Sequence, residues 1–153
     1  MTNFPQPAHG IIDGPVHRYA LRVYYEDTDA GGVVYHANYL RWFERARSDL
    51  LALLNIDQAA ALGAGEGAYT VAEASLKYLH PARLGDAVTI ETRAEAVGRA
   101  SATLRQTAWR DQIRLTDASV RVGFVGPDGR PRRQPQAWHQ AFMAMTSSSE
   151  GHE

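Results

Sequence analysis

The sequence predicts an α+β fold in which one long helix packs against a mainly antiparallel sheet. Two patterns favour this fold. Apolar residues recur at helical spacing from Tyr39 to Leu54, whereas from Ala68 to about Val125 they alternate with polar residues, as in half-buried strands. Strands that follow one another without intervening helices form antiparallel sheets. At 153 residues, the chain is long enough for one domain with a substantial core.

The first strand is expected in the segment HRYALRVYYE, residues 17–26. The side chains expected on its apolar face are Tyr19, Leu21, Val23 and Tyr25. The acidic residues Asp27 and Asp29 therefore lie at the C-terminal end of this strand.

A long amphipathic helix follows, and it begins between His36 and Tyr39. Its apolar stripe consists of Tyr39, Trp42, Phe43, Ala46, Leu50, Leu53 and Leu54. The stretch ALGAGEGA, residues 61–68, ends the helical region, because glycine is costly inside a helix. It lacks the Lys-Ser/Thr ending of a P-loop and the glycine spacing of a dinucleotide site, so a linker is expected there.

Four strands are expected after the helix, and the turn HPARLGD, residues 80–86, separates the first two. Their inward-facing positions are Ala72, Ala74, Leu76 and Tyr78, then Val88, Ile90, Thr92, Ala94 and Ala96. The segments SATLRQTAWR and IRLTDASVRVGFV form a hairpin across the dipeptide Asp111-Gln112. A short packing helix is expected within residues 135–145, with Trp138, Phe142 and Met145 on its apolar side.

The chain ends differ from the predicted body in composition. Residues 1–16 are rich in proline and glycine and are expected to form a flexible arm, and residues 146–153 a disordered tail. A single domain over residues 17–145 remains. In that domain one helix covers one face of the sheet, and the other face and the edges stay uncovered. Self-association into at least a homodimer is therefore expected.

Composition excludes several classes of function. The formal net charge of −1 gives no overall field that would attract nucleic acid or an anionic membrane. The chain has no cysteine, so disulfides and thiolate chemistry are excluded. No segment resembles a signal peptide or a membrane span, and a soluble cytoplasmic protein is expected.

The acidic cluster Glu26, Asp27 and Asp29 permits three interpretations. A calcium loop starting at Asp27 would need an oxygen ligand at Gly31 and a bidentate glutamate at Asn38, so the EF-hand pattern is not met. A transition-metal site would lack paired histidines and cysteines. The simplest interpretation is a turn and cap, in which carboxylate and hydroxyl oxygens bind nearby backbone N–H groups.

The residues after the cluster favour a catalytic interpretation. Gly31 and Gly32 allow the backbone to approach a ligand closely. The helix that begins between His36 and Tyr39 supplies free N–H groups at the positive end of its dipole. A carboxylate beside a helix N-terminus provides a base or nucleophile together with stabilisation for a developing oxyanion, which is half of an acyl-transfer site.

The stretch YYEDTDAGGVVYHANYLRWFERAR, residues 24–47, closely resembles the signature of hot-dog-fold acyl-CoA thioesterases. The similarity is to the Tol-Pal-cluster thioesterase family in particular and, more distantly, to 4-hydroxybenzoyl-CoA thioesterase. It continues through HPARLGD and covers most of the body from His17 to Val125. The resemblance implies a hot-dog fold, in which a five-stranded sheet wraps the long helix, and it implies a homodimer or homotetramer.

The resemblance also implies catalytic positions. The second acid of the family's D-x-D motif corresponds to Asp29, and the backbone N–H that holds the oxyanion corresponds to His36. The implied reaction is thioester hydrolysis, with Asp29 as general base for water or as a nucleophile that forms a mixed anhydride. It requires no metal and no cofactor. The His36 imidazole is a separate candidate for contact with the substrate.

Four further positions are candidates for substrate binding. Gly32 allows close approach of the backbone, and Tyr39 belongs either to the acyl pocket or to the core. Arg99, in the hairpin VGRAS, and Arg83, in HPARLGD, are candidates for the phosphates of coenzyme A; otherwise they are solvated arginines. The acyl donor is either coenzyme A or an acyl carrier protein.

Two other functions are compatible with the predicted fold. A hydratase or dehydratase acting on acyl thioesters would use the His36 imidazole with a carboxylate as its proton-transfer pair. A non-catalytic module that binds acyl thioesters would not need the Asp29 carboxylate. The fold supports all three functions, so the residues of the site must discriminate between them.

Overall fold

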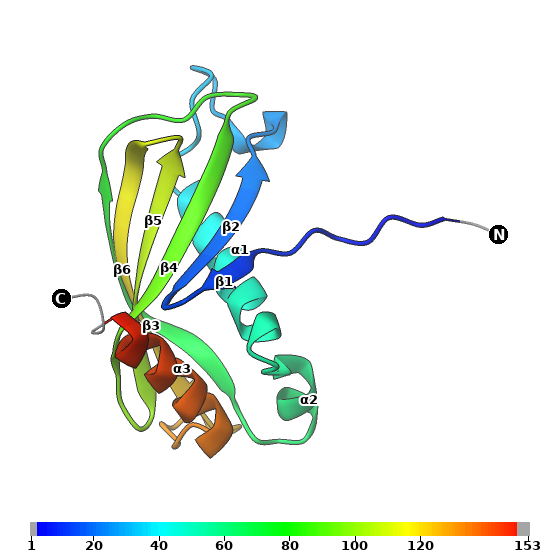
Figure 1. Cartoon of the computed structure of the whole chain (residues 1–153), viewed down its shortest axis with the longest axis vertical. Helices are drawn as coiled ribbons and strands as arrows, with labels where there is room; N and C mark the ends of the chain where they lie inside the picture. The colour runs from blue at the N-terminus through cyan, green and yellow to red at the C-terminus, as the bar shows by residue number, and fades with distance from the viewer. Residues whose placement is uncertain (1–2, 150–153) are drawn as a thin grey trace.

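The computed structural model describes residues 3–149. A sheet of six strands in the order β1-β2-β4-β5-β6-β3 forms its centre, and every neighbouring pair is antiparallel (Figure 1). The strands are β1 (Ile11–Asp13), β2 (Val16–Arg22), β3 (Ala68–Tyr78), β4 (Ala87–Val97), β5 (Ser101–Arg110) and β6 (Ile113–Val125). The expected α+β fold is confirmed, with six strands in place of five.

Four helical segments accompany the sheet. They are the 3-10 helix η1 (Tyr25–Asp27) and the α-helices α1 (Asn38–Leu53), α2 (Gln58–Gly63) and α3 (Gln136–Ser149). Helix α1 crosses one face of the sheet and contacts β2 and β4, while α3 packs against β4 at the end of the sheet where β3 begins (Figure 1). Within residues 3–149, no helix is long and apolar enough to cross a membrane.

The hydrophobic core lies between α1 and the sheet. The buried apolar residues of α1 are Tyr39, Trp42, Phe43, Ala46, Leu50 and Leu51. They face buried strand residues that include Val88, Ile90, Leu104, Ala108 and Val120. Each large apolar side chain buried in this way stabilises the fold by about 1.5–3 kcal/mol. Most of the predicted stripe is confirmed, although Leu53 and Leu54 at the end of the helix are only half-buried.

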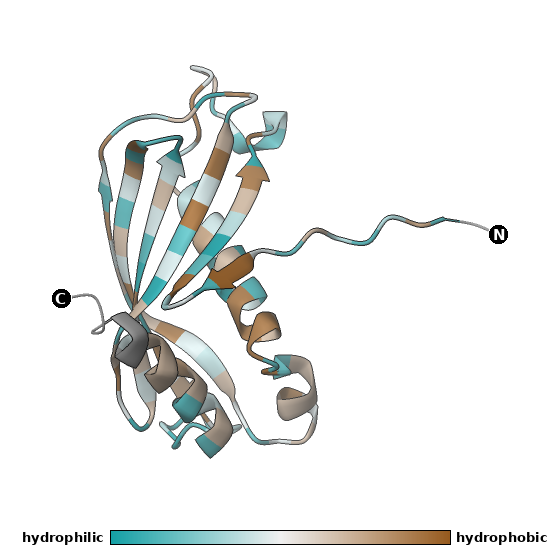
Figure 2. Ribbon diagram, in the orientation of Figure 1, coloured by the Kyte–Doolittle hydropathy of each residue, from teal (hydrophilic) through white to brown (hydrophobic). Residues whose placement is uncertain are grey.

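The expected hairpin between β5 and β6 is confirmed. Arg110 pairs with Ile113, and Asp111 in the turn adopts a φ of 55°, in the left-handed region that aspartate tolerates better than most residues. Hydropathy alternates along the neighbouring β2 and β4 (Figure 2). The expected inward position of Ala96 is wrong, because a register shift between Ala94 and Ala96 reverses the alternation and leaves Ala96 exposed.

The chain ends are more ordered than their composition indicates. In the expected arm of residues 1–16, β1 pairs with β2, and the Gly10 N–H donates to Asp49 Oδ2 over 2.9 Å. The same oxygen lies 2.7 Å from Nε2 of the fully buried His17, so Asp49 joins the arm, β2 and α1. At the other end α3 extends past residue 145 to Ser149, and residues 150–153 of the expected tail lie outside the described residues.

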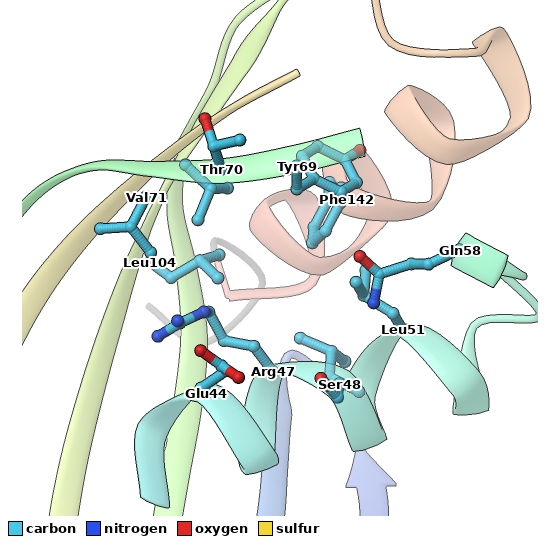
Figure 3. Close-up of a pocket in the computed structure, with 12 residues that line it drawn as sticks. Glu44, Arg47, Ser48, Leu51, Gln58, Tyr69, Thr70, Val71, Leu104 and Phe142 are labelled. Carbon is cyan, nitrogen blue, oxygen red and sulfur yellow. The ribbon is translucent and has the colours of Figure 1, made fainter. Parts of the chain in front are cut away.

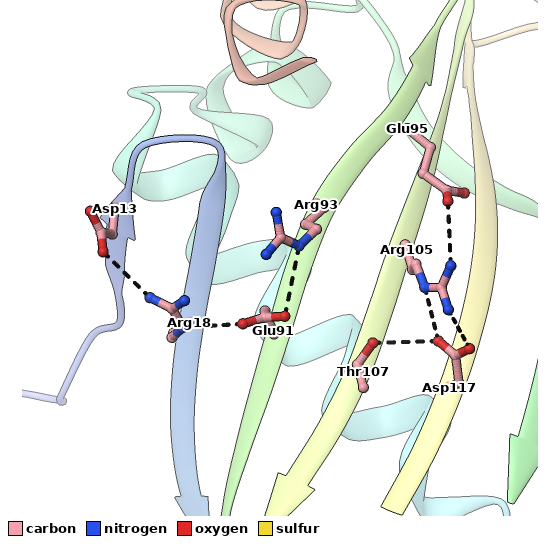
Figure 4. A network of polar contacts seen from close by, with 8 residues as sticks. All are labelled: Asp13, Arg18, Glu91, Arg93, Glu95, Arg105, Thr107 and Asp117. Atoms are coloured by element: carbon pink, nitrogen blue, oxygen red, sulfur yellow. Dashed lines mark hydrogen bonds and ion pairs between the residues drawn. The ribbon is translucent and has the colours of Figure 1, made fainter. Parts of the chain in front are cut away.

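The sheet face away from α1 carries charged side chains joined across strands (Figure 4). Arg105 donates to both carboxylate oxygens of Asp117, over 3.1 and 2.6 Å, and Arg18 donates to Glu91 over 3.2 Å. These partly exposed pairs are worth little individually, about 0–1 kcal/mol each. They match positive with negative groups and leave this face polar.

Strand β3 is a long edge strand, and among residues 3–149 it pairs with β6 alone. Its expected inward residues Ala72, Ala74 and Tyr78 are exposed, and Leu76 is half-buried, because β3 curves away from α1 and among the described residues has little cover on that side (Figure 1). A free edge of this length is a surface for pairing with another chain.

Candidate active site

The segment between β2 and α1 forms a tight double turn at one end of the sheet (Figure 1). The expected first strand ends at Arg22, and Tyr25 lies in η1 with its side chain exposed. The Tyr35 N–H donates to the Asp27 carbonyl over 3.0 Å, and the Asp29 N–H donates to the Val33 carbonyl over 2.8 Å. These bonds fold residues 27–35 back on themselves and bring the acidic cluster to the start of α1.

Asp27 is the buried acid of the cluster. Its Oδ2 accepts the Tyr24 N–H over 2.8 Å, and its Oδ1 accepts from the side-chain amide of Asn38 over 3.0 Å. Asn38 is the first residue of α1 and is itself buried. The turn-and-cap role considered for the whole cluster is therefore performed by Asp27, which fixes the helix start to the preceding turn.

Asp29 is the exposed acid. Its Oδ1 accepts the N–H groups of Gly31, over 2.8 Å, and Val33, over 3.3 Å. Within residues 3–149, no hydrogen bond reaches its Oδ2. One oxygen thus holds the side chain in place while the other faces solvent, which is the geometry that a general base or nucleophile requires.

The glycine pair shapes the turn beside Asp29. Gly32 has a φ of +81°, in the left-handed region that favours glycine, and its N–H donates to the Asp29 carbonyl over 3.1 Å. A Cβ on Gly32 would meet no atom within 4 Å, so the space beside it is open. Gly32 is therefore needed for the conformation of the turn and leaves room for a ligand.

The start of α1 presents free donors. Across the described part of the chain, the backbone N–H groups of His36 and Ala37 have no acceptor. The His36 carbonyl accepts from the Tyr78 hydroxyl over 2.8 Å, which orients this peptide segment. The His36 ring is exposed and contacts the rings of Tyr35 and Tyr78, and no described residue is hydrogen-bonded to it. In the described residues, no hydrogen bond orients the imidazole for proton transfer.

Tyr39 lies in the core, in contact with Trp42 and Tyr78 at centroid distances of 5.0 and 5.7 Å. Burial raises the pKa of its hydroxyl. Tyr39 is 3% exposed, so in this chain its ring offers almost no surface to a substrate.

The two candidate arginines lie at opposite ends of the sheet. Arg83 forms a backbone bridge with Val33, which places it beside the Asp29 turn, and its side chain is exposed. Arg99 lies in the hairpin between β4 and β5, where its carbonyl accepts the Gln134 N–H over 2.8 Å. The strand registers put that hairpin at the far end of the sheet, so one chain does not bring Arg99 to Asp29.

A pocket of about 380 Å³ opens between α1, the first part of β3 and α3 (Figure 3). Its walls are mostly apolar, and Glu44, Arg47 and Ser48 of α1 line one side. The sequence interpretation placed no substrate-binding residue here, because Arg47 belongs to the polar residues of an amphipathic helix. Figure 3 shows its side chain directed along the groove below Val71 and Leu104.

A metal site was one of the three interpretations of the acidic cluster. In the described residues, no group of three or more histidine, cysteine, aspartate or glutamate side chains has an arrangement that could hold a metal ion. Asp27 and Asp29 instead bind backbone and amide N–H groups. The geometry around them is that of a turn with one free carboxylate oxygen.

Sequence comparison identifies relatives of this chain. The profile of the thioesterase superfamily matches residues 31–116. The acyl-CoA thioesterase YbgC of Haemophilus influenzae is 39% identical over 126 residues, which span 79% of this chain and 93% of the relative. A 1,4-dihydroxy-2-naphthoyl-CoA hydrolase of Thermosynechococcus vestitus is 36% identical over 76 residues, 50% of this chain and 52% of that enzyme.

Solved structures share the fold. A probable thioesterase from Bartonella henselae superposes with a TM-score of 0.74 at 32% identity and covers 78% of this chain and 99% of its own. A DHNA-CoA thioesterase from Staphylococcus aureus gives a TM-score of 0.82 at 22% identity, over 90% of this chain and 95% of its own. The expected hot-dog fold is confirmed by these neighbours.

Proposed function

The chain belongs to the thioesterase superfamily, and on that premise we propose that it hydrolyses acyl-CoA thioesters with Asp29 as the catalytic carboxylate. The observation that carries the proposal is that, within residues 3–149, Asp29 Oδ2 accepts no hydrogen bond, in a turn that leads into the start of α1, where the His36 and Ala37 N–H groups have no acceptor. An exposed carboxylate and a set of backbone donors are the two parts that acyl transfer requires.

In the proposed reaction the thioester carbonyl oxygen binds the His36 N–H at the start of α1. Asp29 Oδ2 either takes a proton from water, whose oxygen attacks the carbonyl carbon, or attacks that carbon itself. The carbon–sulfur bond breaks and the thiolate of coenzyme A leaves and takes up a proton. In the second route water then hydrolyses the mixed anhydride and regenerates Asp29. The backbone N–H stabilises the oxyanion in both routes.

The exposed His36 ring supports thioester hydrolysis over a hydratase. A hydratase would need an imidazole oriented by a carboxylate, as in other acid–base sites. Among residues 3–149, no hydrogen bond or ion pair joins His36 to a carboxylate. The His36 contribution is therefore assigned to its backbone N–H, and the ring is available for contact with the substrate.

The surface that binds the acyl-CoA is proposed to include the other substrate-binding candidates from the sequence. Gly32 gives the thioester access to Asp29, and Tyr39 forms the inner wall near the start of α1. Arg83, beside the turn, is the candidate for a phosphate of coenzyme A bound by the same subunit. The same pantetheine arm would reach the site from an acyl carrier protein, so both donors should be compared.

A homodimer through β3 is proposed to complete the site. Large apolar side chains remain exposed along this edge and near the start of α1, namely Tyr35, Leu40, Val71, Tyr78 and Leu79. Antiparallel pairing of two β3 strands about a twofold axis would cover them. The same symmetry would bring the Arg99 hairpin of one subunit toward the Asp29 turn of the other. Two such dimers would form the expected homotetramer.

Thiol release from short, long and aromatic acyl-CoAs tests the proposed reaction. Asp29→Asn keeps the size of the side chain and an oxygen for the Gly31 N–H, but removes the base, so its kcat/KM should fall at least about a hundredfold. Glu26→Gln, at an exposed acid three residues earlier, serves as the matched control and should retain activity within about threefold. Unchanged activity in Asp29→Asn would exclude the mechanism. A wild-type protein that binds acyl-CoA without hydrolysing it would be a binding module.

A further inference from the structure

The pocket between α1, β3 and α3 contains the guanidinium group of Arg47. The Arg47 Nη1 donates to Gln106 Oε1 over 2.8 Å. None of the ion pairs among residues 3–149 includes Arg47. Nε and Nη2 of this guanidinium have no hydrogen-bond acceptor in the described part of the chain. Arg47 thus retains donors that face a pocket with mostly apolar walls (Figure 3).

The position of the guanidinium is fixed by a fully buried amide. Gln106 is 0% exposed, and its Nε2 donates to the Phe43 carbonyl and to Thr92 Oγ1, each over 3.0 Å. Because both amide hydrogens are used, Oε1 must face Arg47. The arginine is therefore held from one side and presents its remaining N–H groups to the pocket.

The surroundings of Arg47 disfavour an unpaired charge. Burial lowers the pKa of its guanidinium, and the nearby Glu44 acts in the opposite direction. Burying a charged group without a partner is unfavourable. A ligand that brings an anionic group into this pocket would supply the missing acceptor, and a carboxylate matches the fork of a guanidinium.

We propose that this pocket receives an acyl group that ends in a carboxylate, so that the substrate is the monothioester of a dicarboxylic acid and Arg47 binds its free end. The inference rests on the proposed function and on the proposed β3 dimer. Residues 69–71 of β3 lie at the end of the sheet away from the Asp29 turn of the same chain. Antiparallel pairing of two β3 strands would bring them toward the Asp29 turn of the second copy, where the other end of the acyl group would carry the thioester. The apolar residues of the pocket contact the methylene chain between the two ends. They are Leu50, Leu51, Val71, Leu104, Val122 and Phe142.

Glu44 is the one carboxylate among the residues that line this pocket. It would repel an incoming carboxylate while supporting the charge of Arg47. Replacing Glu44 by glutamine removes the repulsion and retains the shape of the side chain. This substitution should therefore increase the preference for a diacid thioester, and a decrease would contradict the proposed charge recognition.

Pairs of substrates with equal carbon number test the inference. Succinyl-, glutaryl-, adipoyl- and suberoyl-CoA are compared with butyryl-, pentanoyl-, hexanoyl- and octanoyl-CoA. For at least one pair the wild-type kcat/KM should favour the diacid, and Arg47→Met should lower that value at least about tenfold, mainly through KM. The neutral partner should change less than about threefold. A general loss for both members, or no diacid preference in any pair, would show that Arg47 is structural.

A binding measurement separates this inference from the proposed activity. Free glutarate, adipate and suberate should raise the melting temperature of the wild-type protein more than pentanoate, hexanoate and octanoate at equal ionic strength. The difference should disappear in Arg47→Met and be reduced in Arg47→Lys, which keeps the charge but loses the fork. A protein that shows this selective binding but hydrolyses no thioester would refute the proposed function and retain the pocket. Equal shifts for both acid series would refute the pocket assignment.

Discussion

Asp27 and Asp29 are two residues apart, yet their surroundings assign them different roles. Asp27 is buried and both of its oxygens accept hydrogen bonds, whereas Asp29 is exposed and keeps one oxygen free. Asp27 is the last residue of η1, and its side chain contacts Asn38 at the start of α1. Asp29 lies in the following turn, where its side chain accepts from Gly31 and Val33. Substitution of Asp27 should therefore lower mainly the stability of the fold, and substitution of Asp29 should lower mainly the catalytic activity.

Asp27→Asn should destabilise the protein by about 1–3 kcal/mol, because an amide nitrogen would face the Tyr24 N–H or the Asn38 amide and leave a buried donor unpaired. Asp29→Asn should change the free energy of unfolding by less than about 0.5 kcal/mol, since its side chain is exposed. Urea unfolding of both variants measures the difference. Equal destabilisation by the two substitutions would contradict the division of roles.

The sequence predicts Asp29 and His36 as site residues through the resemblance of residues 24–47, but it does not predict the residues that contact them from other elements. The motif of residues 24–47 places an acid before a helix start, which the local spacing alone predicts. Tyr78, whose hydroxyl binds the His36 carbonyl, comes from a strand 42 residues away. Arg47 and Gln106 are 59 residues apart. Such contacts depend on the packing of α1 on the sheet, which hydrophobic periodicity does not specify.

At the scale of elements, the positions of the long periodic segments were predicted well, although the inward face of β3 was not, and the short elements were missed. α1 and β4 to β6 have many side chains whose burial produces the pattern. β1 has three exposed residues, and its strand conformation comes from pairing with β2. α2 has six residues in a glycine-rich region and is capped by Asp57, whose side chain accepts the Ala60 N–H over 2.9 Å. A single capping residue is not enough to predict so short a helix from the sequence.

The junction between α2 and β3 depends on Gly67. Its φ is +138°, and a Cβ there would lie 2.4 Å from the Val125 carbonyl oxygen. Gly67→Ala should therefore destabilise the protein by at least about 2 kcal/mol, since strain and a backbone clash combine. Gly63→Ala is the control, because a Cβ at that helical residue meets no atom within 4 Å. It should be neutral or stabilising by up to about 1 kcal/mol. Thermal unfolding measures the stability of both variants. An equal loss of stability in Gly63→Ala and Gly67→Ala would contradict the special role of Gly67.

In the molecule as a whole, α1 covers one face of the sheet, and the β3 edge is open. The face away from α1 is polar and its charges are paired across strands, so it needs no apolar cover. The β3 edge is different, because its backbone lacks a partner on one side and apolar side chains surround it. The uncovered edge was expected from the single long helix in the sequence. Its location at β3 required the strand order, which connects β3 to β6 rather than to its neighbours in sequence.

Pairing through β3 predicts that a charge in the middle of this strand separates the subunits. Ala74 is exposed near the centre of β3, so in a twofold pair its copies would lie close to each other. Ala74→Glu would place like charges across the interface and should raise the dimer dissociation constant at least about tenfold, which corresponds to about 1.4 kcal/mol. Ala74→Thr, which is uncharged and favours strands, should leave the dimer intact.

Sedimentation velocity over a range of protein concentrations measures this equilibrium, and thiol release on the same samples reports whether the site needs both subunits. If the site is completed across β3, the activity of Ala74→Glu should fall with dilution in parallel with the dimer fraction, while that of Ala74→Thr should not. A monomeric variant with full activity would mean that one chain contains the whole site. Unaltered association of Ala74→Glu would place the interface elsewhere, and the exposed apolar residues near the start of α1 would then need another partner.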